Sequence, residues 1–207
     1  MTKFIKGDIF EQKYRNPQTC IIHQCNCIAI LPHGLSQNIA EEFGSYANSY
    51  GRRQRLSRNI AAVSDRPEPG TLEFCKGSPN VVALFAQFSF GKPARYNFNF
   101  DTHIKRGCEH DTKENRMLYF KLALTNLKNF LQEDNNTIFE RNKVYPNELT
   151  ENDFFRKSYI REIHTIIFPH KIGCGLAGGE WNEYKKEIEN FASQILPRTV
   201  LILEKNS

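Results

Sequence analysis

The hydrophobic positions of the chain follow two spacings, one typical of strands and one typical of helices. Strand-like runs cover residues 3–10, 20–24, 71–74, 80–88, 163–168 and 199–203. Apolar residues at helical spacing predict a helix that begins near residue 35 and two more over 112–131 and 181–194. Because strands and helices alternate, the pattern predicts a three-layer α/β/α sandwich with a central mixed, mostly parallel sheet.

The length of the chain predicts one domain over residues 1–207. With 207 residues and 40% hydrophobic content, the chain can bury a single good-sized core. Two polar segments, near 46–70 and 132–159, have the composition of surface insertions, the second with a short helix near 148–155.

The composition favours a protein of the cytoplasm or nucleus. No apolar run approaches the roughly 18 residues that suggest a membrane span, and the first residues lack a signal peptide's apolar region. Several of the six cysteines lie in apolar runs, which indicates reduced thiols. His103, Cys108 and His110 offer three metal ligands without a fourth in register, so neither a metal nor a cofactor is expected.

The formal charge of +5 is spread along the chain, with one dense basic run at residues 51–58. Such a run either contacts a phosphate backbone or forms a solvated surface.

The segment 171–181, Lys-Ile-Gly-Cys-Gly-Leu-Ala-Gly-Gly-Glu-Trp, stands out as a connection between a buried strand and a helix. Glycine permits positive φ angles and close approach of the backbone to a ligand, and a strand-to-helix turn offers free N–H groups. The segment therefore suits a diphosphate, although a glycine-rich turn that binds nothing has the same composition.

Three further residues follow other predicted strands. Asp8 either accepts hydrogen bonds from an adenine ring or forms an Asx turn, and Asn26 satisfies either its own loop or a ligand hydroxyl. Gly34 marks the turn into the first helix. Ligands of α/β sheets bind beyond the carboxyl ends of the strands, so these residues and the Gly-rich segment are expected at one site.

The order of these motifs resembles that of macrodomains, which are ADP-ribose-binding modules. Gly-Asp-Ile at 7–9, Cys-Asn-Cys at 25–27 leading to Gly34, and the glycines of 173–179 before Trp181 bracket nearly the whole chain. The stretches at 22–27, 84–91 and 121–128 most resemble the branch that contains ADP-ribose 1″-phosphate phosphatases.

This resemblance implies a role for each motif. Asp8 would hold the adenine amine and the Ile9 N–H the adenine ring, while Asn26 would contact the distal ribose. Gly34 and Leu35 would lie on one side of the diphosphate. The opposite side would consist of Gly173, Cys174, Gly175, Leu176, Ala177 and Gly178.

The chain departs from the family pattern at three places. Pro32 and His33 replace the usual Gly-Gly before the helix, which stiffens the first phosphate loop and adds an imidazole. Gln87 and Ala177 stand where members that cleave ADP-ribosyl esters have a lysine and an aspartate, which argues against that mechanism. Leu176 would have to cover the distal ribose in place of an aromatic residue.

The leading functional expectation is a hydrolase that removes a group from the distal ribose of ADP-ribose, most concretely the 1″-phosphate. The candidate catalytic residues are Asn26, His33 and His23, since a phosphoryl transfer needs a base near neutral pKa. The alternatives are an ADP-ribosyl hydrolase that acts on modified protein or nucleic acid, and a module that binds ADP-ribose without turnover. A membrane partner is not expected.

Overall fold

The computed structural model describes residues 2–93, 111–132 and 160–205. The expected short helix near 148–155 and the candidate ligands His103, Cys108 and His110 lie outside these residues. In the described part, no group of three His, Cys, Asp or Glu side chains is placed to hold a metal ion. No described helix has the length and apolar character that crossing a membrane requires.

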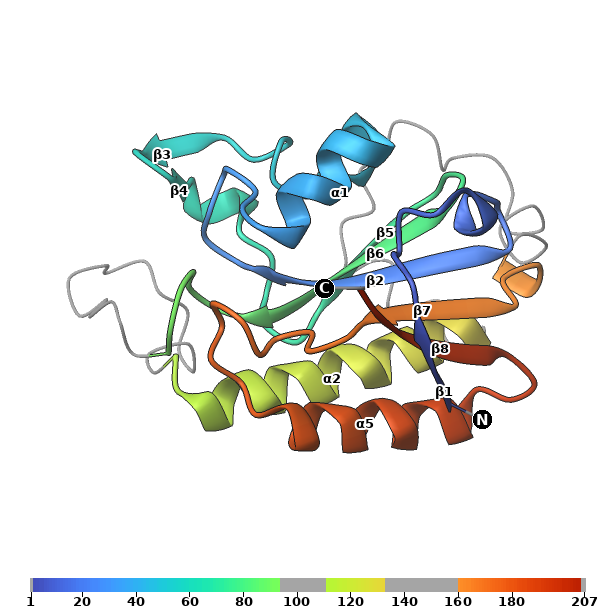
Figure 1. The fold of residues 1–207 in the computed structure, drawn as a ribbon. Helices are drawn as coiled ribbons and strands as arrows, with labels where there is room; N and C mark the ends of the chain where they lie inside the picture. Colours follow the sequence, from blue (N-terminus) through green and yellow to red (C-terminus); the bar gives the residue numbers. More distant parts are fainter. Residues whose placement is uncertain (1, 94–110, 133–159, 206–207) are drawn as a thin grey trace.

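The described residues form a six-stranded sheet in the order β1-β8-β7-β2-β6-β5 (Figure 1). The strands are β1 (Thr2–Lys6), β2 (Thr19–Asn26), β5 (Leu72–Cys75), β6 (Asn80–Gln87), β7 (Thr165–Pro169) and β8 (Thr199–Glu204). β5 runs antiparallel to β6, and the other neighbours pair in parallel. The mixed, mostly parallel sheet is therefore confirmed, as is the position of the fully buried β6 between two other strands.

Helices cover both faces of the sheet and complete the three expected layers. α1 (Leu35–Phe43) lies on one face, and α2 (Lys113–Gln132) and α5 (Trp181–Gln194) lie side by side on the other (Figure 1). Successive residues of β2 serve the two layers, because side chains alternate along a strand. Ile22 belongs to the core beneath α2 and α5, whereas Ile21 packs in the cluster that contains Ile39 of α1.

Smaller elements connect the layers. The structure places 3-10 helices at η1 (Gln12–Tyr14), η2 (Ser45–Ala47) and η3 (Val63–Asp65), and a two-stranded hairpin of β3 (Arg55–Ser57) and β4 (Ile60–Ala61).

The segment 46–70, expected as a surface insertion, is partly buried. Ala47, Tyr50 and Ala61 belong to the core, and Arg53 is 8% exposed. The hairpin itself projects from the molecule beside the end of β2 (Figure 1). The polar composition of the segment did not indicate its buried residues, because they are few and widely spaced.

Candidate functional site

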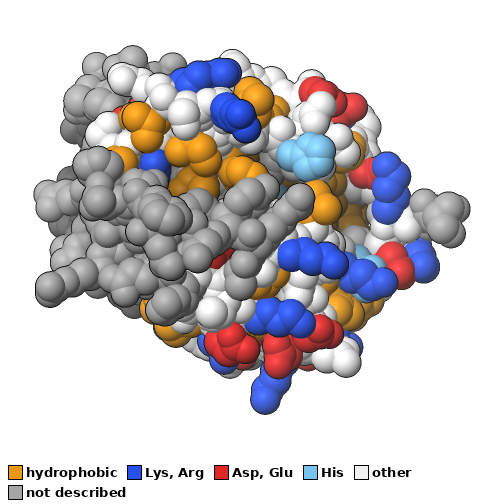
Figure 2. Space-filling view, turned by 90° about the vertical axis from the view of Figure 1, so that its left-hand side faces the viewer, with side chains coloured by type: hydrophobic (Ala, Val, Ile, Leu, Met, Phe, Trp, Pro, Cys, Tyr) orange, Lys and Arg blue, Asp and Glu red, His pale blue; other side chains and the backbone are white. Residues whose placement is uncertain are grey.

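The candidate site lies at the edge of the sheet where the parallel strands end. β1, β2, β6 and β7 share one direction, so the segments that follow them emerge at the same edge. Figure 2 views this side of the molecule, where hydrophobic side chains gather between two groups of lysine and arginine side chains. The structure thus brings together the segments that contain Asp8, Asn26 and Gly34 with the Gly-rich loop, defined as residues 170–179.

Asn26 shapes the loop that follows β2. Its Oδ1 accepts a hydrogen bond from the Ala29 N–H at 2.7 Å, and its Nδ2 donates to the Tyr50 hydroxyl at 3.2 Å. The side chain is buried, and the backbone N–H of Asn26 also donates to Tyr50 Oη. Of the two roles considered for this amide, the structure shows the one that satisfies its own loop.

Arg53 supports the same loop from below, which corrects the interpretation of the basic run. Its Nη1 donates to the carbonyls of Asn26, Cys27 and Ala29 at 3.1, 3.1 and 2.7 Å. The guanidinium also lies 4.6 Å from the centre of the Tyr50 ring. This arginine is neither solvated nor available to a phosphate backbone, because its guanidinium is buried and donates hydrogen bonds to the carbonyls of the loop.

The other arginines of the basic run differ in their surroundings. Arg52 pairs with Glu73 at 2.6 Å, whereas Arg55 and Arg58 are exposed on the β3–β4 hairpin. Burial raises the pKa of the Glu73 carboxyl, and the neighbouring Arg52 opposes that rise. Three of the four arginines at 51–58 are thus exposed, and only Arg53 is buried.

The entry into α1 offers backbone N–H groups to an anion. Gly34 has φ 59°, and a side chain added there would meet open space. No described side chain caps the helix, so its first N–H groups are available for a negatively charged ligand. Leu35 is half-buried and packs on the core beneath the helix. His33, one residue before Gly34, is exposed.

His23 is a packed core residue. It is 1% exposed, and its Nδ1 lies 3.2 Å from the hydroxyl of Ser36 on α1. Burial lowers the pKa of the imidazole to about 4, so the ring is neutral at pH 7. The side chain points into the layer between the sheet and α1 rather than to the edge where the strands end.

The glycines of the Gly-rich loop have two different tasks. A side chain at Gly173 or Gly179 would collide with the Tyr184 ring at about 2.5 Å, so these two glycines let the loop pack on α5. Gly175, in contrast, faces open space. Within the described residues, the N–H groups of Gly175, Leu176 and Ala177 make no backbone hydrogen bond. They form the free donor set that a phosphate needs.

Two side chains of this loop differ in exposure. Leu176 is 64% exposed and extends into solvent. The thiol of Cys174 donates to the Ile172 carbonyl, and burial raises its pKa to about 11. The thiol is therefore protonated at neutral pH and is no nucleophile.

Asp8 forms the Asx turn that was one of the two roles considered for it. Its Oδ1 accepts from the Phe10 N–H at 3.1 Å, which is an Asx turn, while its Oδ2 lies 3.0 Å from the Lys205 ammonium. Ile9 is buried in the core next to it. The turn fixes the carboxylate beyond the end of β1, and its second oxygen is paired with Lys205.

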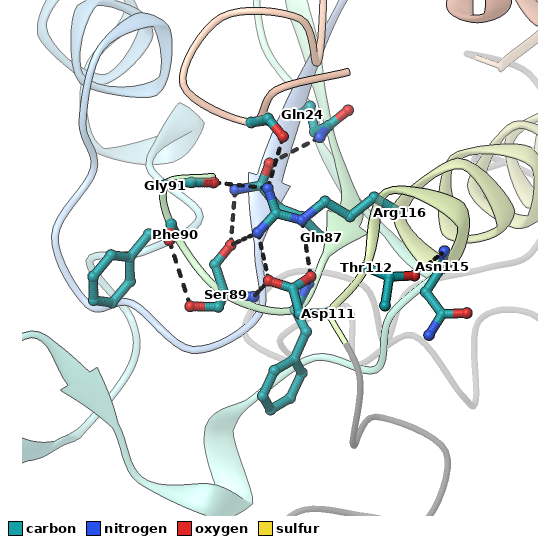
Figure 3. A network of polar contacts seen from close by, with 11 residues as sticks. Gln24, Gln87, Ser89, Phe90, Gly91, Asp111, Thr112, Asn115 and Arg116 are labelled. Atoms are coloured by element: carbon teal, nitrogen blue, oxygen red, sulfur yellow. Dashed lines mark hydrogen bonds and ion pairs between the residues drawn. The ribbon is translucent and has the colours of Figure 1, made fainter. Parts of the chain in front are cut away.

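The sequence interpretation missed a polar network centred on Arg116 of α2 (Figure 3). Arg116 is 1% exposed and pairs with Asp111 through two nitrogens. Its Nη1 donates to the carbonyls of Gly91 and Ala177 at 2.7 and 2.8 Å. The signal was available, since Arg116 continues the apolar stripe of α2 at the spacing of Phe120 and Ala123.

Gln87, at the end of β6, belongs to the same network. Its Oε1 accepts from Gln24 Nε2 at 2.8 Å, and its Nε2 donates to the Ser89 carbonyl at 3.0 Å. Gln87 is buried, so its amide supports the backbone of this edge.

Comparisons with known proteins identify the fold. No family model matches the sequence, and no curated protein does. The structure is similar to the macrodomain of Mycobacterium tuberculosis DarG, with a TM-score of 0.58 and 12% identity over 100% of this chain and 99% of that chain. It is also similar to the macrodomain of Thermus aquaticus DarG, with a TM-score of 0.57 and 13% identity over 98% and 97%.

A third similar structure is a protein of unknown function from Bacteroides thetaiotaomicron, with a TM-score of 0.56 and 15% identity over 99% and 98% of the two chains. These matches show that the chain has a macrodomain-like fold. At such identities the likeness concerns the fold, and the function has to be argued from the site.

Proposed function

We propose that this macrodomain-like chain binds ADP-ribose and hydrolyses a group from its distal ribose, most concretely the 1″-phosphate. The observation that carries the proposal is the pair of donor sets at one edge of the sheet. One is the uncapped start of α1 behind Gly34, and the other is the N–H groups of Gly175, Leu176 and Ala177. Two such sets suit the two phosphates of a nucleoside diphosphate sugar.

The adenosine end of the ligand would lie at Asp8, where an Asx turn holds the carboxylate beyond β1. The exposed Leu176 would cover the distal ribose. Both assignments follow the order of the motifs along the sheet edge and extend the ligand from β1 toward β6.

His33 is the best candidate for the acid–base step. Of the three proposed catalytic residues, Asn26 and His23 are buried and bonded within the fold, whereas His33 is exposed beside Gly34. Water would attack the phosphorus and give its proton to the His33 imidazole, while the bond from phosphorus to the 1″ oxygen breaks. The departing 1″ oxygen takes a proton from solvent and becomes a hydroxyl, and the N–H donors stabilise the charge on the phosphoryl oxygens.

The test is release of phosphate from ADP-ribose 1″-phosphate by the purified protein. His33→Ala should lower the rate at least about tenfold, the minimum expected for loss of an acid–base group. His164→Ala is the matched control, because His164 is also exposed but precedes β7 at the opposite edge. Equal rates for wild type and His33→Ala would reject the assignment of His33.

A second candidate is an ADP-ribosyl hydrolase that acts on modified protein or nucleic acid. It is favoured by Arg55 and Arg58, which are exposed on the β3–β4 hairpin. Asn59 of that hairpin accepts hydrogen bonds from the N–H groups of Ile30 and Leu31, just before His33. Release of ADP-ribose from modified DNA, RNA or protein would support this activity over the phosphatase.

Calorimetry with ADP-ribose separates both enzymes from a binding module. Tight binding without turnover of any of these substrates would identify a module that recognises ADP-ribose. If ADP-ribose does not bind, the proposal that it is the ligand is rejected.

A further inference from the structure

The buried guanidinium of Arg116 joins two loops that are 86 positions apart, from Gly91 to Ala177. A single nitrogen, Nη1, donates to one carbonyl in each loop at 2.7 and 2.8 Å. The loops also touch directly, because a side chain at Gly178 would lie 3.1 Å from the Pro93 ring. Arg116 therefore fixes the Gly-rich loop against the loop that follows β6.

Asp111 makes this arrangement possible inside the protein. Its carboxylate neutralises Arg116 and also accepts from the N–H groups of Phe88 and Ser89 at 3.3 and 3.2 Å. A buried ion pair persists only when its remaining donors and acceptors are bonded, and here the backbone of both loops supplies the partners.

The inward position of the Ala177 carbonyl decides where the neighbouring N–H groups point. Gly178 N–H closes a turn on the Gly175 carbonyl at 3.1 Å, so the outer N–H groups of this turn remain those of 175–177. We propose that Arg116 is a positioning residue, which holds this turn so that its N–H groups are pre-organised for the β-phosphate and distal ribose. This inference rests on the proposed binding of ADP-ribose.

The proposal predicts a selective loss of affinity. Lysine keeps the charge of Arg116 but lacks the planar fork that reaches the two loops and Asp111 together. Arg116→Lys should weaken ADP-ribose binding about tenfold through lost pre-organisation. Binding of AMP, which lacks the β-phosphate and the distal ribose, should stay within about twofold, as for independent sites. A purely structural role would change both affinities together.

Arg198 offers a matched control. It donates from Nε to the Ile163 carbonyl at 3.0 Å and from Nη2 to the Leu131 carbonyl at 2.9 Å, so it also joins two segments through carbonyls. It directly precedes β8, at the end of the sheet opposite the candidate site. Arg198→Lys should lower Tm without changing the ratio of the ADP-ribose and AMP affinities.

Calorimetry of wild type, Arg116→Lys and Arg198→Lys measures the affinities for both nucleotides and tests the positioning role. Equal losses for ADP-ribose and AMP in Arg116→Lys would overturn the positioning role. Failure of the wild type to bind either nucleotide would instead reject the proposed function.

Nuclear magnetic resonance on the wild type keeps the test decisive if Arg116→Lys does not fold. The Arg116 Nε–H and the Gly178 amide resonances should shift when ADP-ribose is added and stay in place with AMP. An Arg116 resonance that does not shift when ADP-ribose binds would contradict the positioning role of Arg116.

Discussion

The Lys205 ammonium, just beyond β8, lies 3.0 Å from Oδ2 of Asp8, the oxygen that an adenine amine would use. The other oxygen of Asp8 is held by the Phe10 N–H, so Lys205 and the ligand compete for the same acceptor. The free protein thus contains a weak internal competitor for its proposed ligand.

Replacing Lys205 by glutamine should therefore tighten ADP-ribose binding. The lysine side chain is 75% exposed, and an exposed pair is weak, so the expected gain in affinity is about two- to fivefold. The gain should shrink as salt concentration rises, because salt screens the same pair in the wild type. Calorimetry at low and high salt measures both effects.

Lys6→Gln controls for the change in net charge. Lys6 pairs with Glu204, the residue before Lys205, at 2.6 Å, and no described contact joins it to Asp8. Weaker binding by Lys205→Gln alone would contradict competition and indicate that Lys205 contacts the ligand.

Arg53 and Arg55 are two residues apart in one basic run, but replacing each by methionine should affect the stability of the protein to very different extents. Arg53→Met leaves three buried carbonyls without their donor and should lower the free energy of unfolding by about 2–4 kcal/mol. Arg55 is exposed, so Arg55→Met should change the free energy of unfolding by less than about 0.5 kcal/mol. Urea denaturation of the two variants gives the comparison, and equal stabilities would show that Arg53 does not support the loop of Asn26.

Much of the fold could be predicted because it depends on local periodicity. The helix expected over 181–194 coincides with α5, and the hairpin through residues 76–79 joins β5 to β6 as expected. The common edge for Asp8, Asn26 and Gly34 followed from one rule, namely that parallel strands end on the same side.

The two buried arginines could not be predicted in the same way. Arg53 binds carbonyls 24 to 27 positions earlier, and Arg116 binds one 61 positions later. Which carbonyls a guanidinium binds leaves no periodic trace in the sequence, even where its position on a helix indicates burial, as for Arg116. Arg53 lies among exposed arginines in the sequence, and Arg116 is a charged residue on the apolar stripe of α2.

Two glycines of the Gly-rich loop should separate stability from binding. Gly173 has φ 74° and contacts Tyr184, so Gly173→Ala strains the backbone, forces the ring to move and should lower Tm by several degrees. Gly175→Ala places a methyl group in open space and should leave Tm unchanged while weakening ADP-ribose binding. Thermal melts and calorimetry on both variants test the division, and full ADP-ribose affinity in Gly175→Ala would contradict close approach of the ligand.

His23 should make the fold sensitive to mild acid. Its pKa is about 4 in the folded protein against an ordinary value of 6.5, so the unfolded chain binds the proton first as the pH falls. The stabilising contribution is complete above about pH 6.5 and is lost toward pH 4, with a loss of about 2 kcal/mol between pH 7 and pH 5. His23→Gln keeps an amide near the Ser36 hydroxyl and should remove this loss, whereas His164→Gln, at an exposed position, should retain it. Urea denaturation at the two pH values measures the difference for each variant, and parallel losses in wild type and His23→Gln would show that the buried imidazole does not control the acid response.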